Sequence, residues 1–406
     1  MSKKVEKSKR YLYNNNVTNL RGMTKVEKNE PIVIAQIMGK WIGGGVEAVV
    51  MNYYRHIDRN KIQFDFICDE DSTNIPYDEI EKLGGRVIIV PPYQMIFKYH
   101  RRLKKILKEG KYRIVHSHIN TLSVFSLFAA KCAGIPIRIA HSHSTIINDK
   151  KELKRNLIKN FLKTFSKFFA TTFFACSDMA AISQFGKKMY KENKVIIIKN
   201  AIDLEKFKYN EKIRKEIRKK FNISENKIVI GHVGRFVETK NHNFIIDVFN
   251  KVNEEKEKYL LLLIGQGPMI NKIKEKVNLL GLQKSVLFLG QRGDINELYQ
   301  AMDIFLLPSL YEGFGMVTVE AQSSNLPCIV SNGVPMSTKF SKNYVFLPIN
   351  DGIKEWVNNV RKFSTVFERK DNTFILESNG FEIKNESKKL ENIYFELLEV
   401  NSNVKN

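Results

Sequence analysis

The stretch Ser309-Leu-Tyr-Glu-Gly-Phe-Gly-Met-Val-Thr-Val-Glu-Ala321 decides the fold that we expect for this chain. A short apolar run at residues 303–308 precedes it and is typical of a buried strand. A turn with two glycines follows, and helical spacing then runs over residues 316–324. This order of strand, glycine turn and helix predicts an open α/β sheet with a ligand site where the strand ends.

Two carboxylates frame that turn. Glu312 stands just before the glycines, and Glu320 follows it at a spacing close to two helical turns, which returns it toward the same side. The turn amides and the start of the helix would suit phosphate or sugar oxygens. Two glutamates at this spacing also occur by chance, and a glycine turn before a helix is often only a turn.

The first half of the chain alternates between apolar runs and helical patterns. The triplet Gly43-Gly-Gly45 follows the first run but does not match the dinucleotide-binding pattern GxGxxG. The alternation predicts a parallel, doubly wound sheet. Strands are expected at residues 31–38, 64–68, 87–90, 114–118, 135–140, 172–176 and 195–198, and helices at 46–57, 77–83, 97–108, 122–133 and 150–169.

The alternation repeats in the second half, after a strongly charged segment at residues 205–220. We therefore expect a second α/β domain. Its further strands are expected at residues 228–233, 259–264, 286–289 and 328–330. One helix is expected to start near Asn241, a second to end near Leu280 and a third to end near Ala301. Two more helices are expected at residues 356–363 and 386–400.

The charge of the chain is unevenly distributed. The net charge is +23; residues 1–200 hold 36 Lys and Arg against 17 Asp and Glu, whereas residues 201–406 hold 30 against 26. The excess implies an anionic partner for the first half: a membrane surface, an acidic acceptor or nucleic acid. Residues 98–105 and 150–155 concentrate it, and residues 153–162 interleave apolar side chains that would face either the core or anionic lipid.

Several classes of protein are disfavoured. The four cysteines are far apart without a CxxC pair, which argues against zinc and indicates buried, reduced thiols in a cytoplasmic protein. Because no run of 18 apolar residues occurs, no transmembrane helix is expected. Residues 1–29 are expected to be a disordered basic leader and not a signal peptide.

The motif Glu-Gly-Phe-Gly-x4-Glu, with Leu-Pro-Ser before it and Leu326-Pro-Cys-Ile-Val330 after it, resembles the Glu-x7-Glu element of retaining GT-B glycosyltransferases. More narrowly, it resembles glycosyltransferase family 4 of capsular and exopolysaccharide biosynthesis. Gly234-Arg-Phe-Val-Glu-Thr-Lys-Asn241 resembles a second element of that family, and the two together are more specific than either alone. The resemblance covers about residues 31–400.

The resemblance implies two Rossmann-like domains facing a cleft. Residues 30–203 would form the acceptor-side domain, residues 204–385 the nucleotide-sugar-binding domain, and residues 386–406 a helix that crosses back to the first domain. The reaction implied is retaining transfer from a nucleotide-diphosphate sugar to a lipid-linked or oligosaccharide acceptor. A UDP-hexose or UDP-N-acetylhexosamine is the first candidate donor, with GDP-mannose left open.

The resemblance also implies roles for single residues. Arg235 and Lys240 would clamp the diphosphate, so no metal and no other cofactor is expected. Glu312 would contact hydroxyls of the donor sugar, Glu320 the ribose, and His118, at a strand end, the donor sugar and acceptor. Histidines at strand ends are also often structural, and Arg292, expected at the base, could be an ordinary surface residue. The remaining expected donor contacts are Gly44, Gly45, Gly313, Phe314 and Gly315.

Three other functions fit parts of this pattern. A nucleotide-sugar 2-epimerase shares the architecture and would need no acceptor. A non-catalytic subunit could retain the fold, but the intact Arg235, Lys240, Glu312 and Glu320 argue against it. Nucleic-acid binding is suggested by charge alone, and no basic-aromatic module supports it, so no nucleic-acid partner is expected. The protein is expected in the cytoplasm, with a peripheral place on the inner face of the cell membrane as an open possibility.

Overall fold

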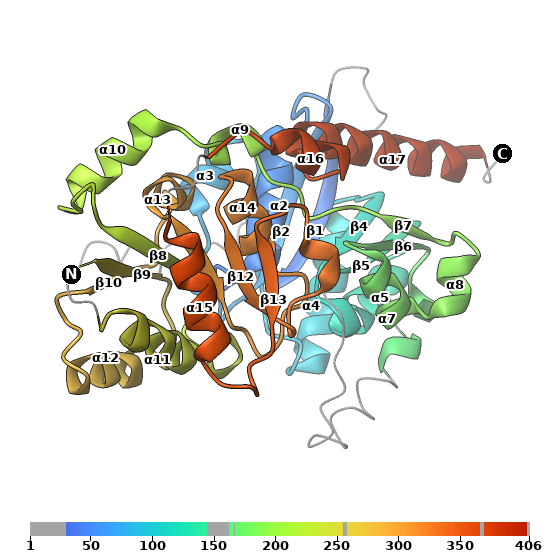
Figure 1. Ribbon diagram of the computed structural model, residues 1–406. Coiled ribbons are helices and arrows are strands. Elements are labelled where there is room, and N and C mark those ends of the chain that lie inside the picture. The colour runs from blue at the N-terminus through green and yellow to red at the C-terminus, as the bar shows by residue number, and fades with distance from the viewer. Residues whose placement is uncertain (1–29, 144–161, 166, 255–257, 366–368, 404–406) are drawn as a thin grey trace. The chain divides into compact units, whose positions relative to one another are not determined.

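The computed structural model describes residues 30–143, 162–165, 167–254, 258–365 and 369–403, which form two compact units (Figure 1). The first unit contains the chain up to Ala201 together with Ile383–Asn406, and the second contains Ile202–Glu382. The leader expected at residues 1–29 and most of the basic helix expected at residues 150–169 lie outside the described residues.

The first unit is built on a seven-stranded parallel sheet with the strand order β3-β2-β1-β4-β5-β6-β7. The chain adds β2 and β3 on one side of β1 and then crosses to β4 on its other side, so ligands are expected between the ends of β1 and β4. The strands are β1 (Ile32–Gly39), β2 (Ile62–Asp69), β3 (Arg86–Val90), β4 (Ile114–Ser117), β5 (Ile137–Ser142), β6 (Thr172–Ala175) and β7 (Val195–Ile197).

Helices cover both faces of this sheet, because successive strand residues point to opposite sides. Ile34 packs in one apolar cluster and its neighbour Ala35 in another. The first face carries α2 (Gly45–His56), α3 (Tyr77–Lys82) and α17 (Ile383–Asn403). The second carries α4 (Ile96–Glu109), α5 (Ser123–Cys132), α7 (Asp178–Phe185) and α8 (Lys187–Lys191).

The second unit has a six-stranded parallel sheet with the order β10-β9-β8-β11-β12-β13. Its switch point lies between β8 and β11. The strands are β8 (Ile228–Val233), β9 (Tyr259–Ile264), β10 (Val286–Gly290), β11 (Ile304–Leu307), β12 (Cys328–Ser331) and β13 (Tyr344–Leu347). One face packs on α11 (His242–Val252), α12 (Ile270–Leu279) and α15 (Lys354–Phe363), and the other on α10 (Glu211–Lys220), α13 (Ile295–Ala301) and α14 (Met316–Ser323).

The parallel α/β architecture predicted from the alternation is confirmed in both units. The sequence missed β13, α7, α8, α10, and the short helices α9 (Leu204–Phe207) and α16 (Thr373–Ser378). These elements are short or, in α10, bury only a narrow apolar stripe, so tertiary packing stabilises them more than local pattern does. The expectation that every cysteine is buried is wrong for Cys132, which is exposed at the end of α5.

Within the described part of the chain, no helix is both long enough and apolar enough to cross a membrane.

Candidate active site

Two loops meet at the switch point of the second unit. One follows β8 and carries Arg235 and Lys240, and the other follows β11 and carries Glu312. Leu310 N donates a hydrogen bond of 2.8 Å to Thr239 O, which joins the loops directly. Since parallel strands end at the same edge of a sheet, neighbouring β8 and β11 bring the two sequence motifs together.

A charge pair lies where these loops meet. Lys240 Nζ is 2.5 Å from Glu312 Oε1, and the side chains are 19% and 9% exposed. Ser309 Oγ donates to the same carboxylate oxygen at 2.6 Å. Among the described residues, Glu312 Oε2 has no hydrogen-bond partner, so this oxygen is available to a ligand hydroxyl.

The glycine turn fixes the start of α14. Gly315 has φ +84°, a left-handed conformation that favours glycine, and its carbonyl accepts hydrogen bonds from the Thr318 amide and hydroxyl, both at 2.8 Å. Phe314 is buried against Phe381, with ring centroids 5.7 Å apart, so its side chain supports the turn from inside. Gly313, just before it, is partly buried. The amides that precede Thr318 in α14 have no acceptor within the helix, as at every helix start.

Glu320 lies on α14 and is partly buried. Its Oε2 is 2.9 Å from the Tyr299 hydroxyl, which also lies 3.1 Å from Val317 O. Burial raises the pKa of Glu320 to about 7, against the opposing effects of the Tyr299 hydrogen bond and the Lys240 charge. Near neutral pH this carboxyl group is therefore divided between its protonated and ionised forms.

The two arginines of the predicted site differ in their surroundings. Arg235 is exposed, and its guanidinium has no ion-pair partner among the described residues. Arg292, after β10, donates to both oxygens of Asp294 at 2.8 and 2.5 Å and lies 5.9 Å from the centre of the Phe221 ring. Arg235 is thus free to meet an anion, whereas Arg292 is already held in place.

In the first unit, His118 follows the end of β4 and is 4% exposed. Its Nε2 is 2.7 Å from Gln36 Oε1, and its Nδ1 is 2.8 Å from His143 Nε2. An amide oxygen only accepts, so His118 carries its proton on Nε2 and accepts from His143 at Nδ1. Burial lowers the pKa of His118 well below its usual value, and the charges of neighbouring histidines add to the effect.

A second part of this buried chain involves α17. The Tyr394 hydroxyl lies 2.6 Å from His116 Nδ1 and 3.4 Å from Gln36 Nε2, and His116 Nε2 lies 3.0 Å from His141 Nδ1. Burial also lowers the pKa of His116 and of His141 well below the usual value. Gln36 therefore joins two histidine pairs into one hydrogen-bonded chain of neutral groups.

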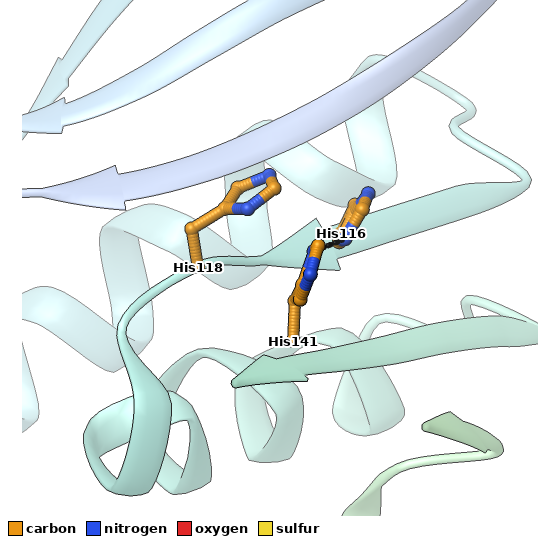
Figure 2. A group of neighbouring side chains, drawn as sticks. All are labelled: His116, His118 and His141. Carbon is orange, nitrogen blue, oxygen red and sulfur yellow. Dashed lines mark hydrogen bonds between the residues drawn. The ribbon is translucent and has the colours of Figure 1, made fainter. Parts of the chain in front are cut away.

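Figure 2 shows three of these histidines, His116 on β4, His118 just after it and His141 on β5. One nitrogen from each lies within 4.8 Å of the others, which is close enough for a shared metal ion. However, both ring nitrogens of His116 and of His118 are engaged with Tyr394, Gln36 and other histidines. A metal ion would have to break these bonds, so the geometry fits a hydrogen-bonded chain better than a metal centre.

Gly44 is the N-cap of α2 and Gly45 is its first residue, so the helix begins one position before the predicted start at Val46. A Cβ at Gly44 would lie 2.9 Å from Glu47 Oε2, whereas a Cβ at Gly45 would have no heavy atom within 4 Å. Glu47 Oε1 accepts a 3.0 Å hydrogen bond from Ile42 N and so turns back over the start of its own helix. Gly44 therefore makes room for Glu47, and Gly45 leaves the surface beside it open.

Comparison with known proteins identifies the family. Residues 43–206 match the family described as Glycosyltransferase Family 4, and residues 213–369 match the one described as Glycosyl transferases group 1. A relative from Bacillus subtilis (strain 168), Putative glycosyltransferase EpsF, is 34% identical over 323 residues, which cover 79% of this chain and 84% of the relative. The chain belongs to glycosyltransferase family 4. It is therefore an enzyme of the transferase class, as predicted.

Two other relatives of this glycosyltransferase carry informative names. The UDP-Gal:alpha-D-GlcNAc-diphosphoundecaprenol alpha-1,3-galactosyltransferase of Escherichia coli is 28% identical over 313 residues, 74% of this chain and 79% of that protein. The capsular polysaccharide biosynthesis glycosyltransferase CapH of Staphylococcus aureus is 25% identical over 373 residues, 89% of this chain and 98% of that protein. Both are named as transferases, so the epimerase alternative is not favoured.

Solved structures confirm the GT-B fold of the glycosyltransferase. Anabaena Alr3699/HepE in complex with UDP and glucose has a TM-score of 0.66 and 17% identity, and the match covers 92% of this chain and 98% of that one. A glycosyltransferase from Rickettsia africae ESF-5 has a TM-score of 0.70 and 18% identity, over 91% and 99% of the two chains.

The sequence missed three residues beside the predicted site residues, Ser309 and Tyr299 in the second unit and Tyr394 in the first. Ser309 stands at a strand end inside the stretch that defines the fold, so its position was a usable signal. Tyr299 and Tyr394 gave no signal, because they reach Glu320 and His116 only through the packing of α13 on α14 and of α17 on the first sheet.

Proposed function

We propose that this glycosyltransferase moves a sugar, with retention of the anomeric configuration, from a nucleotide-diphosphate sugar to a lipid-linked acceptor in polysaccharide biosynthesis. The observation that carries the proposal is the Lys240–Glu312 pair, held by Ser309 at the β8–β11 switch point. A cation for phosphate and a carboxylate for sugar hydroxyls meet there at the place where α/β sheets bind ligands.

The relatives support the choice of donor and acceptor. The Escherichia coli relative is named for transfer from UDP-Gal to an acceptor on diphosphoundecaprenol, and a structure of the same fold was solved with UDP and glucose. CapM and CapH of Staphylococcus aureus are named for capsular polysaccharide biosynthesis. A UDP-hexose or UDP-N-acetylhexosamine is accordingly the donor that we propose first.

The leaving group defines the role of the cations. When the anomeric carbon–oxygen bond breaks, negative charge grows on the diphosphate, and Arg235, Lys240 and the first amides of α14 stabilise it. The acceptor oxygen attacks the same face of the sugar, and the departing phosphate oxygen takes its proton. On this account Lys240 turns from Glu312 toward the diphosphate when the donor binds.

The remaining predicted residues position the donor and acceptor. Glu312 Oε2 accepts from a donor-sugar hydroxyl, and Glu320 accepts from the ribose hydroxyls. His118 is neutral, since burial lowers its pKa, and it therefore acts through hydrogen bonding and shape and carries no positive charge. Gly44 and Gly45 leave space beside α2, so the acceptor can come close to the backbone there.

An exposed basic and aromatic surface in the first unit supports work at a membrane. Phe97 on α4 is 90% exposed and stands next to Lys98. The ring centroids of Phe128 on α5 and Phe169 are 5.0 Å apart, and Lys131 Nζ lies 4.6 Å from the centroid of the Phe168 ring. We propose that this surface rests on anionic lipid and brings the enzyme to its lipid-linked acceptor, with each cation contributing roughly 1 kcal/mol.

A donor screen tests the function. Purified enzyme is offered UDP-glucose, UDP-galactose, UDP-N-acetylglucosamine, UDP-N-acetylgalactosamine and GDP-mannose, with and without polyprenyl-diphosphate-linked sugars, and nucleotide release and product stereochemistry are measured. We expect one UDP-sugar to give acceptor-dependent UDP release, α-configured product from an α-linked donor, and activity that survives EDTA. Release of a free 2-epimer without acceptor, or an inverted product, would overturn the proposal.

A further inference from the structure

A pocket of about 380 Å³ opens at the carboxyl edge of the first sheet. Its walls come from the ends of β1 and β2, the start of α2, and the segments that follow β3 and β4. It therefore lies at the β1–β4 switch point, and its volume falls within the range of sites that hold small molecules. His118, which the family resemblance assigns to the donor sugar and acceptor, is one of its lining residues, but the resemblance assigns no role to the carboxylates in its wall.

Asp69 is the unusual residue of this wall. It is the last residue of β2, it is 3% exposed, and its side chain lines the pocket. Its carboxylate forms no hydrogen bond or ion pair with any other residue that the structure describes. Buried carboxylates are normally paired, because an unpaired one loses its hydration without compensation. Burial, with smaller contributions from Asp71 and Glu70, raises the pKa of Asp69 to about 7.

The other charges around the pocket add to its acidic character. Glu47 also lines it, is nearly buried, and uses only Oε1 to accept from Ile42 N, so Oε2 stays available. Lys40 at the rim pairs with Asp71 at 2.8 Å, and these two charges offset each other. In a unit whose overall charge is strongly positive, this pocket is therefore negative.

This charge pattern discriminates between classes of ligand. A phosphate or carboxylate group would be repelled by Asp69 and Glu47, and no unpaired cation among the described lining residues would compensate. Sugar hydroxyls are donors that a carboxylate accepts strongly, because hydrogen bonds to a charged group are shorter and stronger than neutral ones. An uncharged, hydroxyl-rich ring also fits the mixture of apolar and polar groups in the wall.

We propose that this pocket binds an uncharged sugar of the acceptor and that the Asp69 carboxylate accepts a hydrogen bond from one of its hydroxyl groups. The inference rests on the proposed glycosyl transfer and names the part of the acceptor that the first unit recognises. The phosphate of a lipid-linked acceptor lies outside this pocket, and Asp69 selects for a hydroxyl at the sugar end.

The test uses the full-length enzyme and the variant Asp69→Asn, which keeps the size of the side chain but removes its charge. Saturation-transfer NMR measures binding of methyl α-D-glucoside, methyl α-D-galactoside, methyl N-acetyl-α-D-glucosaminide and glucose 6-phosphate. We expect at least one neutral glycoside to bind the wild type and to bind the variant about tenfold more weakly. The KM for the lipid-linked acceptor should rise by at least about tenfold, with the donor Kd unchanged within about twofold.

Glu70→Gln is the matched control. Glu70 is the next residue in the chain, is exposed and does not line the pocket, so its loss of charge should leave acceptor KM and glycoside binding unchanged. Thermal unfolding separates binding from folding. Because Asp69 is a buried, unpaired carboxylate, Asp69→Asn should be as stable as the wild type or more stable at pH 8, and a lower Tm would indicate a structural role and overturn the inference.

Other outcomes would also overturn it. These are equal glycoside binding to wild type and Asp69→Asn, no glycoside binding to the wild type, or tighter binding of glucose 6-phosphate that is lost in the variant. Calorimetric titration with MgCl2 or CaCl2 tests whether the pocket is a cation site. Cation binding by the wild type that is lost in Asp69→Asn would overturn the sugar proposal. Failure of the proposed function is distinguishable, because it would appear as absent acceptor-dependent nucleotide release in the wild type itself.

Discussion

Lys240 Nζ lies 2.5 Å from Glu312 Oε1, although 72 positions separate the two residues in the chain. They meet because β8 and β11 are neighbours in the second sheet and end at the same edge. The pair is nearly buried and shares one carboxylate oxygen with the Ser309 hydroxyl. The pair therefore keeps the two charges together at the switch point, and the proposed function requires a donor to draw Lys240 from Glu312 toward its diphosphate.

Replacing Lys240 by Met or Glu312 by Gln should impair catalysis more than stability. Lys240→Met should cost on the order of 2–4 kcal/mol of transition-state stabilisation, because the diphosphate loses a cation. Glu312→Gln should lower kcat by at least roughly tenfold, since the sugar loses a charged hydrogen-bond partner. Steady-state kinetics with the donor found in the screen measures both.

The double variant Lys240→Met/Glu312→Gln serves as the control for the ion pair. If each residue acts on the donor, the double variant should lose more kcat/KM than either single variant does. Wild-type kinetics for both single variants would contradict the site assignment.

Donor binding should strengthen as pH rises from 6 to 8. Burial raises the pKa of Glu320 to about 7, and only the ionised form accepts from both ribose hydroxyls. Protonation at pH 6 should therefore weaken UDP binding about tenfold relative to pH 8. Calorimetric titration of UDP at both pH values measures this change.

The variant Glu320→Gln controls for the titration of UDP itself. Its affinity should be lower than that of the wild type at pH 8, and the part of the pH dependence due to Glu320 should vanish. An identical pH profile in wild type and Glu320→Gln would contradict the role of this carboxylate.

Tyr394→Phe should lower the free energy of unfolding by about 1–3 kcal/mol. The change leaves the buried His116 Nδ1 and the Gln36 amide without the hydroxyl that joins them. Urea denaturation measures the loss. Tyr259→Phe is the matched control, because Tyr259 is also buried but its hydroxyl has no partner among the described residues. An equal effect of both changes would contradict a special role for the histidine chain.

The histidine chain should make the fold sensitive to acid. Burial holds the pKa of His116, His118 and His141 well below the usual value and lowers that of His143 to about 4. Below about pH 6.5 the unfolded chain protonates these histidines and the folded chain does not. The free energy of unfolding is therefore unaffected by them above about pH 6.5. It decreases as the pH is lowered further, by up to about 5 kcal/mol per pH unit for four histidines.

Two carboxyl groups act in the opposite direction. Burial raises the pKa of Asp69 and of Glu320 to about 7. Their stabilising contribution to the free energy of unfolding is therefore fully present below about pH 4 and is lost as the pH rises through about 7. Because the histidines outnumber these two carboxyl groups, the urea concentration at the unfolding midpoint should decrease as the pH is lowered from 7 to 4. A constant midpoint over this range would show that the histidines do not stay neutral in the folded protein.

Charge reversal on α4 should release the enzyme from anionic vesicles. Lys98, Arg101 and Lys105 are exposed on this helix, whereas Leu103 and Leu107 face the core. Changing the three cations to Glu should abolish co-sedimentation with phosphatidylglycerol vesicles at low salt, where the wild type binds. High salt should also release the wild type, because exposed charges are screened.

A variant with Glu at Lys272, Lys274 and Lys362 changes the net charge equally on exposed positions of the second unit. It should bind vesicles like the wild type. Equal loss in both variants would mean that overall charge, and not the surface of α4, governs binding. Equal binding of the wild type to neutral and anionic vesicles would contradict the membrane proposal and leave the transferase assignment intact.

Much of the architecture followed from local pattern. The strands at residues 228–233 and 259–264 were predicted with the bounds that the structure has, because a buried parallel strand is a continuous apolar run between turns. Helix α10 was missed because its apolar face is narrow among eight charged residues, and its packing in the second unit stabilises it. The same limit applies to β13, a short strand at the edge of the sheet.

The sequence by itself determined the two parallel α/β units, the family, and the motifs that hold Arg235, Lys240, Glu312 and Glu320, because apolar periodicity and short motifs are local properties of the chain. Tertiary structure alone decided which side chains meet. The Lys240–Glu312 pair, the Tyr394 hydroxyl against His116 and the unpaired, buried Asp69 all depend on strand order and on helix packing between distant segments. Burial and partner geometry then decided the charge states of Glu320 and the histidines, since the solvation of a group depends on the whole fold around it.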